Sequence, residues 1–229
     1  MRCSKPLVYR FVLALAVVSF ASTAMAADPF DDIFDIDNLT VRITPDLPFV
    51  NVLHNGKPVT ILRHQAPYHR IEPPYDRTSR NCPPYCIQPM VIAPGVETIG
   101  ELELIEYLTQ AREGDQSILV IDSRTKPEFE RGTIPGAVNV PYEKLDRDHS
   151  SAEEVAETME MEFSVMRDDA LWNFTSPKTL VFFCNGPWCG QSPTNIRALL
   201  TAGYPPSKIK WYRGGMQSWE QLGFTTVKP

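Results

Sequence analysis

Two cysteines five positions apart are the residues of this chain best suited to chemistry. Cys184 follows the apolar run 180–183, which is typical of a buried strand, and Cys189 comes next. Ser192 and Pro193 then favour a helix start, because serine caps helices and proline suits a first turn. Helix amides and the helix dipole stabilise a thiolate at such a junction, and the thiolate is the nucleophilic form. Placement alone fits two interpretations equally well: a nucleophile at Cys184, or a buried or disulfide-bonded structural cysteine.

The segment from Cys184 to the helix start is the candidate active-site loop. Besides the two cysteines, the loop contains Asn185, Gly186, Pro187, Trp188, Gly190, Gln191 and Ser192. The two glycines let a loop curl until several backbone amides face one point and form an anion-binding nest, to which Pro187 has no amide to contribute. Trp188 is expected either to form an apolar rim for an acceptor or to be a buried structural residue.

Cys189 has two interpretations. It can act as a resolving thiol, which attacks an oxidised or sulfur-loaded Cys184 and closes a disulfide. A permanent disulfide with Cys184, or a thiol that only fills space, is the alternative. The resolving role is favoured, because a second thiol in the loop would otherwise threaten the first.

Cys82 and Cys86 form a second close pair. Two prolines between them predict a turn that brings both sulfurs within disulfide reach. Four cysteines follow residue 26 and allow three pairings, of which spacing favours one bond within each close pair. With His64, His69 or Met90 nearby, a zinc or copper(I) site is the alternative by ligand type, but the histidine spacing matches no standard metal pattern. We therefore expect a structural disulfide between Cys82 and Cys86 and no metal site.

Residues 1–26 have the three parts of a secretory signal peptide. Basic residues precede an apolar run from residue 11 to 21, and small residues end at Ala26. The run is too short to cross a bilayer, which needs about 20 apolar residues. We expect cleavage after Ala26, a periplasmic or secreted product and no membrane span. Cysteines in such a compartment tend to form disulfides.

Composition excludes several classes of protein. Hydrophobic residues make up 43% of the chain and charged residues 22%, which excludes a generally disordered or fibrous chain. Taking the three basic residues of 1–26 from the total of 22 leaves 19 against 28 acidic residues, a net charge of −9. Phosphate binding depends on clustered lysine and arginine, so a nucleic-acid partner is not expected.

The chain beyond the signal peptide divides at about residue 95. Residues 27–95 form a proline-rich extension, in which the runs 49–53 and 58–62 flank an Asn-Gly turn and predict a hairpin. Residues 96–229 alternate helix and strand signals, which predicts an α/β domain with a parallel sheet flanked by helices. The expected strands are 118–121, 137–140, 180–183 and 209–212. Four helices are expected. The first opens at a capping box over 98–101, the second spans 151–168, the third runs from Ser192 to Gly203, and a short fourth helix contains Trp219.

Three ordered motifs of residues 96–229 resemble the rhodanese family. They are Ile-Asp-Ser-Arg at 121–124 with Glu-Phe at 128–129 and Gly-Thr-Ile-Pro-Gly-Ala at 132–137, Cys184 after a strand, and Arg-Gly-Gly-Met at 213–216 with Trp219 and Leu222-Gly223. The resemblance implies the rhodanese fold and a sulfurtransferase that carries sulfur as a persulfide on Cys184. It also implies that Asp122 and Arg124 are a supporting pair beside the loop, and that no cofactor is required.

The loop departs from the commonest pattern of the family. Thr133 stands where the first motif usually has histidine, and the loop has no arginine or lysine to receive an anionic donor. It is similar to a rhodanese subclass with a second cysteine five positions after the first. We therefore expect thiosulfate to be a poor donor. Phosphatases of this fold clamp phosphate with an arginine at the end of the loop, where this chain has Gln191 and Ser192, so phosphatase activity is not expected.

The expected function is sulfur transfer through Cys184 from a small sulfur donor or a persulfide-bearing protein to a thiol acceptor. One alternative is a dithiol–disulfide oxidoreductase that uses Cys184 and Cys189. Another is a non-catalytic module in which the extension and the sheet bind a partner protein.

Overall fold

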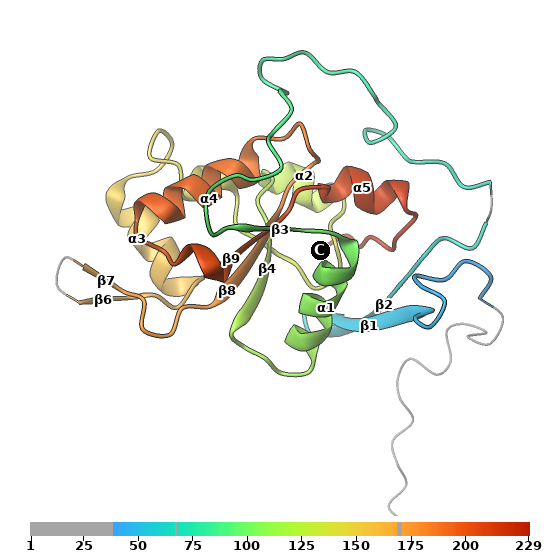
Figure 1. Ribbon diagram of the computed structural model, residues 1–229, viewed down its shortest axis with the longest axis horizontal. Helices are drawn as coiled ribbons and strands as arrows, with labels where there is room; N and C mark the ends of the chain where they lie inside the picture. Colours follow the sequence, from blue (N-terminus) through green and yellow to red (C-terminus); the bar gives the residue numbers. More distant parts are fainter. Residues whose placement is uncertain (1–38, 67, 169–170) are drawn as a thin grey trace, which may run out of the picture.

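A five-stranded parallel sheet forms the centre of the computed structural model, which describes residues 39–66, 68–168 and 171–229 (Figure 1). In spatial order the strands are β3 (Glu97–Ile99), β9 (Ile209–Tyr212), β8 (Thr179–Phe183), β4 (Ile118–Asp122) and β5 (Val138–Asn139). Every pair of neighbouring strands in this sheet is parallel. The α/β class predicted from the sequence is therefore confirmed, and the strand that precedes Cys184 is central.

Helices cover both faces of this sheet. The helices are α1 (Glu101–Arg112), α2 (Lys126–Arg131), α3 (Ala152–Met161), α4 (Gln191–Thr201) and α5 (Gly215–Gln221), with short 3-10 turns at η2 (Tyr142–Lys144) and η3 (Pro206–Lys208). Leu104 of α1 and Trp219 of α5 are buried in one hydrophobic cluster, whereas Met159 of α3 and Ile196 of α4 are buried in the other. The sheet thus separates two cores.

Strand β8 contributes to both cores. Val181 and Phe183 belong to the cluster with α1 and α5, while Leu180 and Phe182 belong to the cluster with α3 and α4. Because successive side chains of a strand point to opposite faces, a strand buried on both sides reads as an unbroken apolar run. This double burial fixes the position of the residue that follows, Cys184.

The hairpin predicted in the extension is present as β1 (Phe49–His54) and β2 (Lys57–Leu62). Asn55 and Gly56 have φ of 51° and 73°, as a tight two-residue turn requires. Val52 and Ile61 are buried in the same cluster as α1. The hairpin therefore packs against the α/β domain, as the sequence predicted.

The predicted start of the first helix was wrong. Thr98 lies in β3, where it pairs with Trp211, and the N-cap of α1 is Gly100. The Glu103 carboxylate accepts a hydrogen bond from the Gly100 amide at 3.0 Å. Sheet pairing thus overrides the local capping signal of Thr98, and the cap moves two residues along.

The predicted acidic helix over 151–168 was wrong at its carboxyl end. Ser151 caps α3 as expected, but the helix ends at Met161. Phe163 and Val165 then return to the core, and β6 (Met166–Asp168) pairs with β7 (Leu171–Asn173). Burial of two apolar side chains outweighs the propensity of the acidic stretch to continue as a helix.

The predicted signal peptide and its cleavage point lie outside the described residues. Within the described ranges, no helix is long and apolar enough to cross a membrane.

Candidate functional site

Cys184 lies at the carboxyl end of β8, on the edge where parallel α/β sheets bind ligands. Its side chain is buried, with 2% exposed. Helix α4 follows, with Gly190 as its N-cap. Ser192 was predicted to be that cap, but it lies inside the first turn, and its hydroxyl bonds to the Cys184 sulfur instead. Ser192 is therefore a residue of the site rather than the helix cap.

Hydrogen-bond donors surround the Cys184 sulfur. Burial acts to raise the pKa of this thiol, but the Cys189 thiol, the hydroxyl and amide of Ser192 and the amide of Gly186 donate to the sulfur and hold its pKa below the ordinary value. The amides that a curled loop was expected to supply are thus those of Gly186 and of the first turn of α4. The arrangement favours a thiolate at Cys184.

Cys189 is the opposite member of the pair. It is free and 4% exposed, and burial raises its pKa well above the ordinary value, with a further increase from its hydrogen bond to Cys184 and from the charge there. Its sulfur also lies 3.3 Å from Oε1 of Gln191, which competes with the Cys184 sulfur for the one thiol proton. The second local disulfide favoured by cysteine spacing is therefore not formed. The loop instead sets a thiol of lowered pKa beside one of raised pKa.

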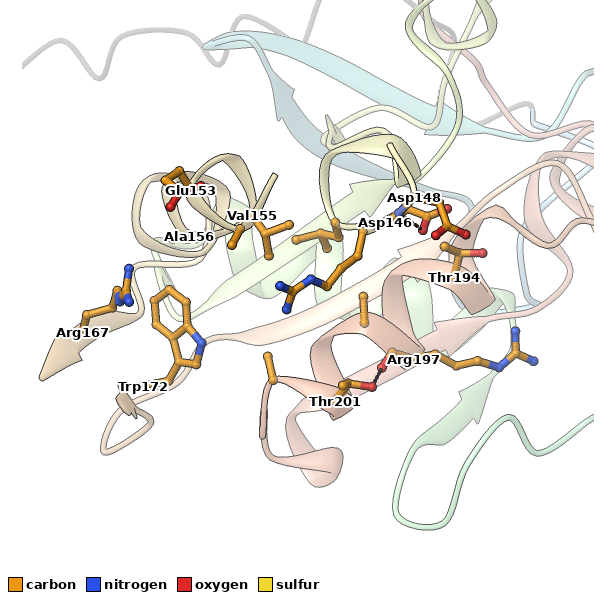
Figure 2. A pocket seen from close by; sticks show the side chains of 15 residues that line it. Asp146, Asp148, Glu153, Val155, Ala156, Arg167, Trp172, Thr194, Arg197 and Thr201 are labelled. Atoms are coloured by element: carbon orange, nitrogen blue, oxygen red, sulfur yellow. Dashed lines mark hydrogen bonds between the residues drawn. The ribbon is translucent and has the colours of Figure 1, made fainter. Parts of the chain in front are cut away.

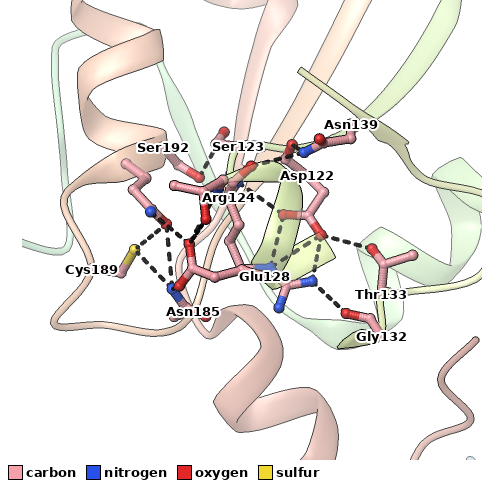
Figure 3. Close-up of polar contacts among 12 residues, drawn as sticks. Asp122, Ser123, Arg124, Glu128, Gly132, Thr133, Asn139, Asn185, Cys189 and Ser192 are labelled. Atoms are coloured by element: carbon pink, nitrogen blue, oxygen red, sulfur yellow. Dashed lines mark hydrogen bonds and ion pairs between the residues drawn. The ribbon is translucent and has the colours of Figure 1, made fainter. Parts of the chain in front are cut away.

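Asp122 and Arg124 form a buried ion pair beside the loop (Figure 3). The guanidinium Nη2 lies 2.6 Å from Oδ2 of Asp122, and both side chains are at most 1% exposed. Thr133 stands where the commonest family motif has histidine, and its hydroxyl donates to the same carboxylate at 2.7 Å. Because a buried charge without its partner is costly, this pair stabilises the end of β4 only as a unit.

Glu128 of α2 connects both ends of the loop, a role that the sequence analysis missed (Figure 3). Its carboxylate accepts from Asn185 Nδ2 at 2.8 Å and from Gln191 Nε2 at 2.9 Å. Burial acts to raise the pKa of Glu128, but hydrogen bonds from Gln191, Thr125 and Asn185 lower it overall. Its place three residues after Thr125, in a capping box, was the available signal.

The Trp188 side chain is held by contacts with three other side chains, so it does not form a free apolar rim. Its Nε1 donates to the side-chain oxygen of Gln217. The Arg80 guanidinium lies 3.7 Å from the centre of the Trp188 ring, and the Tyr85 ring meets it edge-on at 5.5 Å. Arg80 and Tyr85 both come from the extension. The extension thus brings a guanidinium to a loop that has no basic residue of its own.

The extension is attached to the loop at further points. Cys82 and Cys86, which flank Tyr85 in the sequence, form a disulfide with their Cα atoms 4.6 Å apart. The amide of Gln88 then donates to the Pro187 carbonyl at 2.8 Å. This stretch of chain lacks helix and strand periodicity, so nothing in its pattern indicated a contact with the loop. The disulfide closes the turn that contains Tyr85, whose ring contacts Trp188.

A cavity of about 610 Å³ lies between α3, α4 and the β6–β7 hairpin (Figure 2), and none of its lining residues belongs to the loop 184–192. Its charged lining residues are Asp146, Arg147, Asp148, Glu153, Arg167 and Arg197. Three of them are acidic and three are basic, so their formal charges cancel. Across the part of the chain that the structure describes, no group of three or more His, Cys, Asp or Glu side chains is placed to hold a metal ion.

Comparison with known proteins identifies the family. The profile of the Rhodanese-like domain matches residues 105–222, about half of the chain, and the protein belongs to this family. The HTH-type transcriptional regulator Rv0324 of Mycobacterium tuberculosis is 27% identical over 116 residues, which are 51% of this chain and 40% of the regulator. The match therefore spans less than half of that relative.

Two solved structures are also similar to this chain. The BH2092 protein from Bacillus halodurans is 16% identical with a TM-score of 0.40, over 57% of this chain and 76% of that protein. The human single-domain sulfurtransferase TSTD1 is 21% identical with a TM-score of 0.37, over 55% of this chain and 96% of that protein.

Proposed function

We propose that this protein is an exported sulfurtransferase that carries sulfane sulfur as a persulfide on Cys184. The observation that carries the proposal is the unlike state of two buried cysteines in one loop. Cys184 has a lowered pKa and four donors to its sulfur, whereas the pKa of Cys189 is raised. A thiolate is the form that attacks sulfur, so this difference selects one nucleophile. Export rests on the pattern of residues 1–26.

The proposed cycle has two displacements that balance without a cofactor. The Cys184 thiolate attacks the outer sulfur of a donor persulfide, the donor's S–S bond breaks, and the donor leaves as a thiolate with the electron pair. Cys184 then carries the sulfur as a persulfide anion. An acceptor thiolate attacks the outer sulfur, and Cys184 leaves as the thiolate that Gly186 and Ser192 stabilise. The donor is a small sulfane-sulfur compound or a persulfide-bearing protein, and the acceptor is a thiol.

Intact-mass measurement tests this function. Reduced protein exposed to a persulfide donor should gain about one sulfur atom, as expected for an activated thiolate. Cys184→Ser should lose the adduct, while Cys189→Ser should still form it because the nucleophile remains. An undiminished adduct in Cys184→Ser would remove Cys184 from the mechanism. Unreactive thiols in the wild type would instead favour a non-catalytic binding module.

A dithiol–disulfide oxidoreductase is the second candidate, and contact between the two cysteines favours it. The Cys184 thiolate would attack a substrate disulfide, and Cys189 would lose its proton and close a 184–189 disulfide while the substrate leaves as a dithiol. Reversible formation of that disulfide, without any gain of sulfur mass, supports this reaction over sulfur transfer.

A further inference from the structure

Tyr75 is a buried residue of the extension that reaches the site from outside the α/β domain. It precedes Cys184 by more than a hundred residues and is 8% exposed. Its hydroxyl oxygen accepts a hydrogen bond from Nη1 of Arg124 at 2.7 Å. The same hydroxyl donates to Oδ1 of Asn185 at 3.3 Å. A side chain of the proline-rich extension therefore joins the buried ion pair to the residue that follows Cys184.

The directions of these two bonds follow from chemistry. A guanidinium can only donate, so the tyrosine oxygen must accept from Arg124 and has its own proton left for Asn185. Burial raises the pKa of Tyr75 to about 12, which keeps that proton in place at neutral pH. The charged groups that act on Tyr75 from the packed elements are Arg124, Asp122, Glu128 and Glu220.

Tyr75 also determines which way the amide of Asn185 points. Because Oδ1 receives the tyrosine proton, Nδ2 must face the other way, where it donates to Glu128 and lies 3.9 Å from the Cys189 sulfur. With the amide reversed, its oxygen would meet the carboxylate of Glu128, and two acceptors would oppose each other. The tyrosine hydroxyl thus fixes the amide in the only orientation that satisfies both neighbours.

Asn185 in turn holds the first residues of the loop. Its backbone carbonyl accepts from the Gln217 amide at 2.9 Å, and its side chain is tied to Tyr75 and Glu128. The next residue, Gly186, supplies an amide to the Cys184 sulfur. An Asn185 that is free to move would let this amide drift from the sulfur. It would also leave the negative charge of Glu128 less balanced beside the loop.

We propose that Tyr75 is a positioning residue of the Cys184 site, so that the extension completes the site rather than merely covering it. The hydrogen bonds of the Tyr75 hydroxyl go to Arg124 and Asn185 rather than to either sulfur. It acts through Asn185, which it holds so that the Gly186 amide stays directed at Cys184. Both consequences of losing this hold, a displaced amide and a less balanced carboxylate, disfavour the thiolate. The proposal rests on Cys184 as the reactive thiolate of the proposed function, but not on sulfur transfer itself.

The test is the pH dependence of Cys184 alkylation in the reduced full-length protein. Iodoacetamide is the probe, and peptide mass spectrometry assigns the modified cysteine. Tyr75→Phe removes only the hydroxyl and should move the apparent pKa of Cys184 upward by about half a unit to one unit, the equivalent of one neutral hydrogen bond. A folded Tyr75→Phe protein with the wild-type profile would overturn the proposal.

Tyr204→Phe is the matched control. Tyr204 is 1% exposed, and its hydroxyl donates to the Lys178 carbonyl at 2.6 Å, so this variant also loses one buried hydrogen bond. It should lower the melting temperature as Tyr75→Phe does but leave the profile of Cys184 in place. An equal shift in both variants would mean that the effect is general loosening, which contradicts the proposal.

Asn185→Ala breaks the same chain of contacts from the other side and serves as the second variant if Tyr75→Phe does not fold. It should shift the profile in the same direction, and adding Tyr75→Phe to it should produce little further shift. Full additivity of the two shifts would show that Tyr75 acts by another route. Because no sulfur donor is used, failure of sulfur transfer in the wild type leaves this test valid.

Discussion

The hydroxyl of Ser192 offers a direct measure of how the loop stabilises the Cys184 thiolate. Ser192→Ala removes one of the four donors to the sulfur and keeps the amide of the same residue. Hydrogen bonds to charged groups contribute about 1.5–3 kcal/mol, which corresponds to about 1–2 pKa units. Because these donors hold the pKa of Cys184 below its ordinary value, losing one should move the pKa upward toward that value.

The sign and size of the rate change then depend on pH. Below both pKa values the thiolate fraction falls tenfold per unit, but a more basic thiolate is a better nucleophile with a Brønsted slope of about 0.4–0.5. Alkylation of Cys184 in Ser192→Ala should therefore be about 4- to 12-fold slower at low pH and several-fold faster at high pH. The two rate profiles should cross, which misfolding does not produce.

Iodoacetamide labelling between pH 5 and 10, with peptide mass spectrometry to identify the labelled cysteine, measures both arms. Ser123→Ala is the matched control, because the Ser123 and Ser192 hydroxyl oxygens lie 3.1 Å apart and both residues are fully buried. It removes the Ser123–Ser192 contact while leaving the donor to Cys184. Superimposable profiles for Ser192→Ala and the wild type would refute the assignment of this hydroxyl to the thiolate.

Three further predictions concern the loop. Cys189→Ser should hold a Cys184 persulfide longer than the wild type in timed mass spectra, because no neighbouring thiol attacks its inner sulfur; equal lifetimes, with both cysteines alkylated separately, would make Cys189 structural. Thiosulfate should be a poor donor, since the Arg80 guanidinium lies on Trp188 and already donates to the carbonyls of Arg77 and Pro74; fast turnover that Arg80→Gln abolishes would contradict this. Gly215→Ala should destabilise the fold and abolish labelling selectivity for Cys184, because Gly215 has φ of +57° and a Cβ there would collide with the Cys184 carbonyl; an unchanged melting temperature would refute that reasoning.

The core of the site could be predicted from the sequence because its signals are local. The apolar run before Cys184 reflects burial of β8 on both faces, and that burial places the cysteine at the ligand-binding edge. Asn55 and Gly56 likewise predict their turn, because few other residue pairs accept positive φ at both positions. In both cases the conformation is determined by residues that are only a few positions apart in the sequence.

The contacts made by the extension could not be predicted in this way. Tyr75 and Arg80 meet the loop across more than a hundred residues of sequence, from a stretch whose prolines remove helix and strand periodicity. Cysteine spacing identified the 82–86 disulfide but assigned a second one to Cys184 and Cys189, since spacing does not reveal that the pKa of one thiol is lowered and that of the other raised. Burial and partner identity decide that difference.

Burial of Cys184 explains why residues from separate parts of the molecule are all expected to affect the pKa of this thiol. With 2% of its side chain exposed, the thiolate receives its stabilisation from protein donors rather than from water. Each donor therefore has a large effect, and so does any residue that keeps a donor in place. Ser192 donates directly, whereas Tyr75 acts from the extension through Asn185 and the Gly186 amide. The pH profile of Cys184 should accordingly order these positions by their distance from the sulfur along the chain of contacts, with Ser192→Ala producing the larger shift and Tyr75→Phe the smaller.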